Sequence, residues 1–207
     1  MIKKAIVYIL MIFTASLATA QSNAQQYIEN VIQRIDKAPG ISAKFDIGSE
    51  HNNGIYMEGT LDMSGKKFRL ETNNLTTWYD GKTMWSYAPS IGEVNITQPT
   101  AQELAEINPY LLLNNYVKYY NIKEINSKNS KERVFSLTTS KRDIFYKEII
   151  LTINTRDVSP TSFQLIDSNN NTTYITISDF DKKVTHPQST FTFDSKQYPD
   201  AAIIDLR

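Results

Sequence analysis

Side chains that could carry catalysis or hold a metal ion are scarce in this chain of 207 residues. It has two histidines, His51 and His186, and no cysteine. His51 lies in a polar, turn-forming run and His186 precedes a proline, so we expect both in exposed loops. The lack of cysteine excludes disulfides, cysteine metal sites and a lipidated cysteine anchor. We therefore predict no metal site and no cofactor.

The remaining polar residues match no catalytic or phosphate-binding motif. The sequence contains no Gly-x-Ser-x-Gly, His-Glu-x-x-His, P-loop or Gly-x-Gly-x-x-Gly pattern. Asp179 and Asp181 are close, but a solvated strand end explains them better than a carboxylate pair for glycoside hydrolysis. The acidic residues lack the regular spacing of a calcium loop. The sequence thus favours a protein that is not an enzyme.

The balance of charge argues against nucleic acid as a partner. Lysine and arginine total 22, as do aspartate and glutamate, so the formal net charge is zero. Binding to a phosphate backbone requires a concentrated basic face. We expect no nucleic-acid partner.

The first twenty residues have the three parts of a secretory signal peptide. Lys3 and Lys4 are followed by an apolar run, residues 5–17, and then by Ala18-Thr19-Ala20. A membrane anchor is the alternative, but the run is short of the ~20 residues that cross a bilayer. We predict a cleaved signal peptide at 1–20 and a single domain at 21–207 that works, soluble and without a lipid anchor, outside the cytoplasm.

A helix is expected at the start of the mature chain, because apolar residues recur there every three or four positions. Ser22 is a plausible N-cap, and Pro39-Gly40 ends the pattern. The apolar face comprises Ala24, Ile28, Val31, Ile35 and Ala38. Such a helix either packs on a sheet, which we favour, or binds a partner by itself.

From Ile41 onward the period changes to two, which is typical of half-buried antiparallel strands. Asp80-Gly81 predicts a type I′ hairpin turn. Expected strands begin at Ile41 and cover residues 55–63, 67–71, 75–79, 82–88, 91–97, 119–125, 133–139, 145–154, 161–166, 173–180 and 190–193. A sheet of about ten or more strands tends to curl. The curl would create a concave face that helices could cover.

A short helical insert interrupts the strands. Thr100-Ala101-Gln102-Glu103 has the pattern of a capping box, and Asn108-Pro109 can begin a second helix. That second helix would carry a cluster of large apolar residues over 110–116. The chain is also rich in aromatic residues, at 11%. These residues either fill a core or line a cavity, and both alternatives are open at this point.

Several segments resemble the periplasmic lipoprotein carriers of the LolA family. The most specific are Lys67-Phe68-Arg69-Leu70-Glu71 and the run from Trp78-Tyr79-Asp80-Gly81-Lys82 to Tyr87. Ala43-Lys44-Phe45, Gly59-Thr60-Leu61 and Phe191-Thr192-Phe193 agree in order with the same family.

The resemblance implies a mainly β protein, an incomplete and strongly curved antiparallel β-barrel with short helices over its concave face. It implies a soluble periplasmic carrier, expected to be a monomer, that shelters the acyl chains of lipoproteins in an apolar cavity. Such a carrier takes its cargo from an inner-membrane lipoprotein-releasing transporter and passes it to an outer-membrane acceptor. The alternatives are a binding protein for another lipid or amphiphile on the same fold, and an assembly subunit with a filled core.

The residues expected to bind lipid are apolar positions on alternating strand sites and on the helical insert. They are Phe45, Met57, Leu61, Met63, Phe68, Leu70, Trp78, Met84, Trp85, Leu111, Leu112 and Tyr116. Met84 and Trp85 point to opposite faces of one strand, so at least one of them does not line the cavity. We expect Phe68 near the cavity mouth.

One position departs from the family pattern. The family's best-known members carry an arginine near Ser64-Gly65-Lys66 that is tied to closure of the helical insert over the cavity, whereas here Lys66 is the nearest cation. Lysine lacks the bidentate fork of arginine. The contact that closes the insert is therefore expected to be different or absent.

Overall fold

A computed structural model of the chain describes residues 23–49 and 57–207. The signal peptide predicted at 1–20 and His51 lie outside the described residues. Twelve strands form one sheet in the order β12-β6-β5-β4-β3-β2-β1-β11-β10-β9-β8-β7. The strands are β1 (Ile41–Ser49), β2 (Met57–Ser64), β3 (Lys67–Thr72), β4 (Thr76–Tyr79), β5 (Met84–Ala88), β6 (Glu93–Thr97), β7 (Asn121–Ile125), β8 (Glu132–Thr138), β9 (Tyr146–Asn154), β10 (Ser159–Asp167), β11 (Thr172–Asp181) and β12 (Ala202–Asp205).

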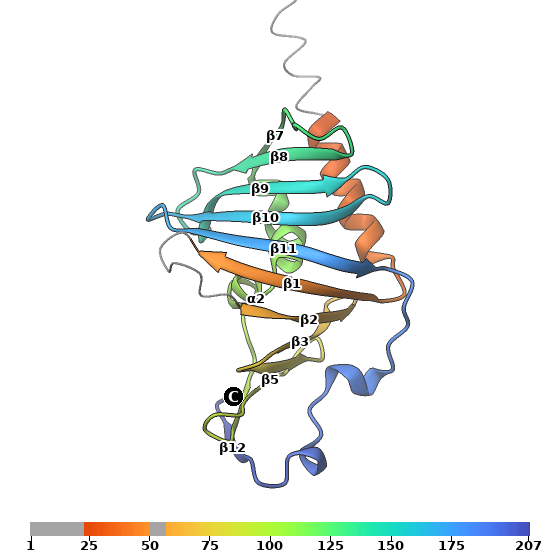
Figure 1. Cartoon of the computed structure of the whole chain (residues 1–207). Coiled ribbons are helices and arrows are strands. Elements are labelled where there is room, and N and C mark those ends of the chain that lie inside the picture. Colours follow the sequence, from red (N-terminus) through yellow and green to blue (C-terminus); the bar gives the residue numbers. More distant parts are fainter. Residues whose placement is uncertain (1–22, 50–56) are drawn as a thin grey trace, which may run out of the picture.

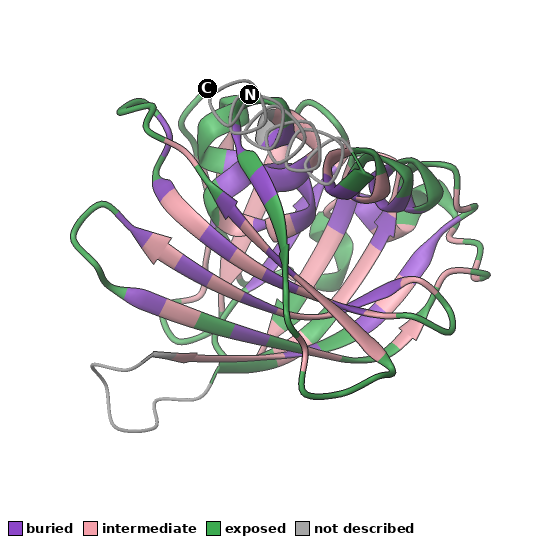
Figure 2. Ribbon diagram, turned by 90° about the horizontal axis from the view of Figure 1, so that it is seen from above, coloured by how far each residue is buried: buried purple, intermediate pink, exposed green. Residues whose placement is uncertain are grey.

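The sheet is curved and stays open, because β12 and β7 form its two edges and do not pair with each other (Figure 1). The helices lie on its concave side. They are an N-terminal helix (residues 23–36) and the two helices of the insert, α2 (Ala101–Ile107) and α3 (Pro109–Tyr116). Figure 2 shows the strands bending below these helices, with buried and more exposed positions alternating along each strand. The mainly β half-barrel expected from the sequence is confirmed.

Strand register determines which side chains face the helices. Met63, Phe68, Tyr79 and Met84 are paired across β2 to β5 and share one face. These four residues belong to the core or pack against it, so this face is the concave one. The neighbouring row, which includes Arg69, Trp78 and Trp85, must face away because side chains alternate along a strand.

The N-terminal helix packs on the sheet as the favoured alternative predicted. Ile28, Val31 and Ile35 are buried in the same cluster as the sheet residues. On the side of this helix nearest β8, the ring of Tyr27 stacks on Phe135 with 5.3 Å between centroids. The Arg133 guanidinium lies 3.8 Å from the centre of the Tyr27 ring. The helix is therefore fixed at this end by packing and by a cation–π contact.

The predicted start signals of both insert helices are confirmed. The Glu103 N–H donates to the Thr100 hydroxyl, and the Glu103 carboxylate accepts from the Thr100 N–H at 2.7 Å. This is the capping box that begins α2. Asn108 caps α3 by accepting from the Tyr110 N–H at 3.0 Å, with Pro109 in the first turn.

Three local predictions are wrong. The Asp80-Gly81 turn is not type I′, because Gly81 has a positive φ of 103° but Asp80 does not. The Asp80 carboxylate instead accepts from the N–H groups of Lys82 and Thr83, which stabilises a longer turn. Residues 190–193 are not a strand, since a 3-10 helix, η3 (Gln188–Phe191), covers the first two and the other two are irregular. The sheet is also not wholly antiparallel, because the unexpected β12 pairs with β6 in parallel.

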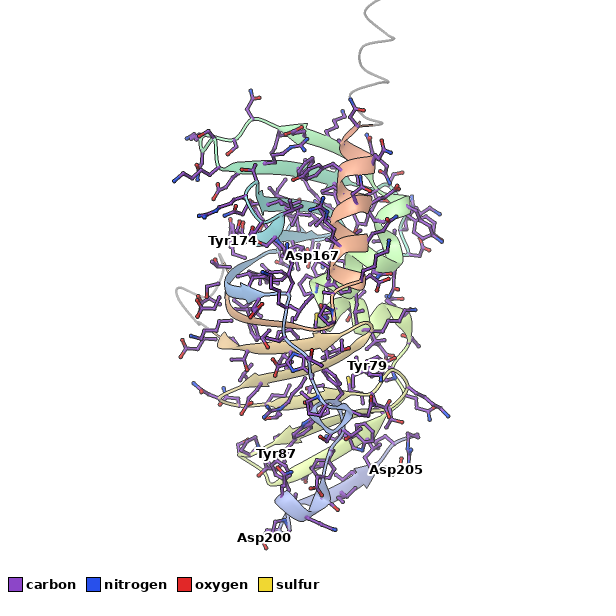
Figure 3. The ribbon with its side chains drawn as sticks, turned by 90° about the vertical axis from the view of Figure 1, so that its right-hand side faces the viewer. Tyr79, Tyr87, Asp167, Tyr174, Asp200 and Asp205 are labelled. Carbon is purple, nitrogen blue, oxygen red and sulfur yellow. The ribbon has the colours of Figure 1, made fainter. Side chains whose placement is uncertain are left out.

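A C-terminal strap, residues 182–201, links β11 to β12 across the convex face. His186 contacts the start of β1, and its ring packs edge-on against Phe191. Further along, Phe193 and Tyr198 pack on Trp78 with ring centroids 5.5 and 5.7 Å away. Figure 3 shows the strap running to the end of the molecule where Tyr87 and Asp205 lie.

Candidate functional site

An apolar cavity lies between the concave face and the helices. It encloses about 80 Å³. The N-terminal helix contributes Ile28, Val31, Ile32 and Ile35, the insert contributes Ile107, Asn108, Pro109, Tyr110 and Leu113, and the sheet contributes residues such as Phe45, Leu61, Met63, Leu70 and Phe163. Cavities lined in this way, by apolar walls with a few polar groups, are where small ligands usually bind.

Four of the residues expected to bind lipid line this cavity, namely Phe45, Leu61, Met63 and Leu70. The position of the Phe45 ring depends on a glycine in the neighbouring strand. A Cβ at Gly59 would come within 2.7 Å of the Phe45 ring and 2.2 Å of the Glu71 carbonyl oxygen. Only glycine lets the Phe45 ring lie across β2 at this place. The Gly-Thr-Leu segment noted in the sequence therefore has a structural role in shaping the cavity wall.

Other predicted residues share the concave side but do not line the cavity. Phe68 is fully buried and packs on Tyr79 at 5.4 Å, so it belongs to the core and not to a cavity mouth. Met84 packs against the same core. Leu111 and Leu112 are buried in α3, and Leu112 faces a smaller hollow beside α2.

The remaining predicted residues lie elsewhere. Met57 is 47% exposed at the start of β2. Trp78 is buried under the C-terminal strap, on the convex face, and Trp85 shares that face. Tyr116 belongs to α3, but its side chain lies outside the described set. Lipid binding by any of these residues stays a prediction.

The residues predicted to bind lipid make up only a small part of the cavity wall. The N-terminal helix residues were recognised as a packing face, but nothing in their spacing separates packing on a sheet from lining a cavity. Leu151, Phe163 and Ile175 come from the strands after the insert and complete the wall. The available signal was alternation, which is clear only for Phe163 between Ser162 and Gln164, and alternation indicates a buried face but not whether that face is packed or lines a cavity.

Three polar residues, Lys44, Asn108 and Tyr110, line the cavity, and the side chains of Lys44 and Tyr110 already have polar partners. The Tyr110 hydroxyl donates to the Asp36 carboxylate at 3.2 Å and accepts from the Asn114 amide at 3.0 Å. Burial, opposed by the Asn114 contact and reinforced by Asp36, raises the pKa of Tyr110 to about 12. Lys44 pairs with Asp179 at 2.7 Å, and that hydrogen bond raises the pKa of Lys44.

Asn108 is the third polar group, and it is 1% exposed. Its side-chain oxygen is used by the cap of α3, which leaves the amide nitrogen directed at the sheet. That nitrogen contacts the Met63 sulfur at 3.7 Å. Tyr110 and Asn108 thus connect α3 to the N-terminal helix and to β2, and we name these two contacts the insert latch.

His186 is not the exposed loop residue that the sequence suggested. Its side chain is 12% exposed, and Nε2 lies 3.0 Å from the Ile41 carbonyl oxygen. The Ser42 hydroxyl and the Asp62 carboxylate are near the same nitrogen, at 3.4 and 3.8 Å. A catalytic relay needs different ring nitrogens to face the serine and the carboxylate. Here Ser42 donates directly to Asp62 at 2.5 Å, so the group is a structural contact of the strap.

Metal-binding clusters and membrane-spanning helices are both missing from the described residues. No group of three or more His, Asp or Glu side chains there is arranged to hold a metal ion. Among the helices of the described part, none combines the length and apolarity of a membrane span.

An open, curved sheet with helices across an apolar cavity defines the half-barrel class of fold. Residues 14–169 match the family described as outer membrane lipoprotein carrier protein LolA. The chain belongs to this family. No protein with a curated description matches the sequence.

Solved structures share the fold at low sequence identity. An uncharacterized conserved protein from Thermus thermophilus aligns with a TM-score of 0.57 and 12% identity over 86% of this chain and 98% of that chain. A DUF1329 family protein from Desulfovibrio piger aligns with a TM-score of 0.52 and 10% identity over 84% and 97% of the two chains. A LolA superfamily protein from Nitrosomonas europaea has a TM-score of 0.46 and 12% identity, over 82% and 97%. At these identities the first two likenesses show the fold alone.

Proposed function

We propose that the protein is a soluble periplasmic carrier that shelters the acyl chains of lipoproteins on their way from the inner to the outer membrane. The observation that carries the proposal is the apolar cavity between the concave sheet and the helices. Family membership supports the choice of cargo. By the same reasoning, the partners are an inner-membrane lipoprotein-releasing transporter and an outer-membrane acceptor.

The energetics of a lipid in water support a carrier. Each exposed CH₂ costs roughly 0.8 kcal/mol, so an acyl chain of about sixteen carbons costs on the order of 10 kcal/mol. The cavity volume of about 80 Å³ is far below the space that one such chain needs. Pockets for drug-sized ligands already enclose roughly 300–1,000 Å³. Cargo binding therefore requires the helices to move apart.

The insert latch is where this movement would begin. The Tyr110–Asp36 hydrogen bond joins α3 to the N-terminal helix. The Asn108–Met63 contact joins α3 to the sheet and uses sulfur, a weak acceptor. We infer that these two contacts do the work of the family arginine, since no arginine stands near Ser64-Gly65-Lys66 in this chain. The free energy of each contact is small compared with that of burying an acyl chain, so bound lipid can replace both.

Dye displacement tests whether the cavity accepts lipid. The native protein should bind the hydrophobic dye ANS, and a synthetic diacylated lipopeptide should displace it. A protein with a filled core would bind no dye in its native state, which would count against the carrier. Displacement by free fatty acid or phospholipid, but not by the lipopeptide, would favour the alternative of a binding protein for another amphiphile.

A reversible crosslink tests whether the helices must part. Asp36→Cys and Asn114→Cys place thiols on the two elements that meet at the Tyr110 hydroxyl. The natural chain has no cysteine, so a short, reducible thiol crosslinker reacts only there. We expect the crosslinked protein to bind no lipopeptide and to recover on reduction. Each single-cysteine variant is the matched control, and unchanged uptake by the crosslinked form would argue against opening at this place.

A further inference from the structure

We propose that the side-chain amide of Asn108 recognises the carbonyl group of the cargo's acyl linkage. The inference rests on the proposed function and adds a chemical preference to it. The cavity would then select chains joined through an ester or amide over plain alkyl chains of equal length. Its polar determinant would be one buried N–H donor at the junction of α2 and α3.

The orientation of the Asn108 amide is set by its neighbours. The side-chain oxygen accepts from the Tyr110 N–H at 3.0 Å. The amide nitrogen must therefore be the atom that contacts the Met63 sulfur at 3.7 Å. Both Asn108 and Met63 line the cavity. A donor that is 99% removed from solvent and satisfied only by a thioether is an incompletely paired group.

Other polar groups in the cavity wall are already engaged. The Tyr110 hydroxyl contacts both Asp36 and Asn114. The Lys44 side chain is 64% exposed and ion-paired with Asp179. Among the described lining residues, this leaves the Asn108 amide as the side-chain donor available to a ligand inside the cavity.

A ligand carbonyl would exchange places with the Met63 sulfur. A carbonyl oxygen is a much better acceptor than a thioether sulfur, so an acyl carbonyl would replace Met63 as the partner of the amide. An alkyl ether of the same length offers no carbonyl and would leave the amide with sulfur. With its carbonyl at Asn108, the chain would extend beneath Ile28, Val31 and Ile32 of the N-terminal helix.

A matched pair of lipids tests the inference. Palmitoyl lysophosphatidylcholine and its hexadecyl ether analogue have the same headgroup and differ in the carbonyl. If the ester forms one more net hydrogen bond than the ether, the wild-type protein should bind the ester roughly two- to tenfold more tightly than the ether. A diacylglyceryl lipopeptide and its dialkyl ether analogue, measured beside them, tell whether the carbonyl belongs to a lipoprotein or to a free lipid.

Two variants separate recognition from structure. Asn108→Ser keeps a good helix cap but loses the amide, so the ester-to-ether ratio should fall to about one. Met63→Leu removes the competing sulfur at similar volume and should preserve or increase the ratio. Equal binding of ester and ether by the wild type would overturn the inference and leave the carrier intact. Binding of neither lipid nor either lipopeptide would overturn the proposed function itself.

Discussion

Tyr110 illustrates how a few polar atoms could control an apolar site. Its ring helps to line the cavity, while its hydroxyl holds α3 to the N-terminal helix through Asp36. Asp36 is exposed, so breaking this hydrogen bond leaves no buried unpaired charge. In the proposed carrier, this contact would modestly stabilise the arrangement seen here and would still allow the helices to part.

Replacing Tyr110→Phe should speed opening. The change removes the hydroxyl but keeps the ring, so we expect faster lipopeptide uptake and a loss of about 1 kcal/mol in the free energy of unfolding. Stopped-flow displacement of ANS measures uptake, and urea denaturation measures stability. The control is Tyr120→Phe, which removes a buried hydroxyl bonded to the Tyr146 carbonyl, away from the cavity wall. Equal uptake rates in both variants and the wild type would contradict a latch at Tyr110.

The same tyrosine predicts a dependence of stability on alkaline pH. Burial raises the pKa of Tyr110 to about 12 in the folded state, whereas tyrosine in an unfolded chain titrates near 10. The unfolded state releases its proton first, so stability present below about pH 10 should fall as the pH rises toward 12. Tyr110→Phe should lose roughly 1 kcal/mol less than the wild type between about pH 9 and pH 11. Urea denaturation at the two pH values checks this, and parallel losses would refute it.

At the scale of single residues, the sequence predicted which face of the sheet a side chain occupies more reliably than whether that side chain is core or lines the cavity. Alternation along β2 and β3 correctly grouped Leu61, Met63 and Leu70. The same alternation did not distinguish Phe68, which is a core residue, from these cavity-lining residues, because a filled interior and a cavity wall show the same pattern. His186 was misjudged because its burial comes from β1 and β2, which are more than a hundred residues earlier in the chain.

Among the elements, local signals predicted the insert and missed the strap. The capping residues of α2 and α3 act within one helical turn, so four residues of sequence are enough to identify them. The C-terminal strap has no periodicity of its own. Its order comes from contacts with distant strands, through Trp78 and through the pairing of β12 with β6. A parallel edge strand formed by the last residues has no local signature.

Phe193→Ala should loosen the strap. The change removes one of the two rings that cover Trp78, which is 5% exposed. We expect a red shift in tryptophan emission, because Trp78 gains contact with water, and a loss of roughly 1–2 kcal/mol in the free energy of unfolding, since Phe193 is only partly buried. The control is Phe145→Ala, at a phenylalanine that is 46% exposed and packs on Tyr146, and it should leave the tryptophan emission unchanged. Unchanged emission in Phe193→Ala would mean that the strap does not protect this tryptophan.

At the scale of the whole molecule, the proposed carrier role depends on how the helices cover the curved sheet more than on any one side chain. The curved sheet supplies a rigid wall, since its strands are joined in one continuous order from β12 to β7. The helices cover the concave side and are held across the cavity by the insert latch and by apolar packing. A rigid wall with a separable cover is the mechanical requirement of a carrier that must both bind and release its cargo.

The identity of the molecule bound in the native periplasm is the most direct test of the carrier function. The full-length protein would be expressed in its own cell, purified from the periplasm without detergent, and analysed by native and denaturing mass spectrometry. We predict that acylated proteins are recovered with the wild type and are reduced in the crosslinked Asp36→Cys, Asn114→Cys form. Recovery of free lipid alone, or of no bound molecule at all, would contradict a lipoprotein carrier.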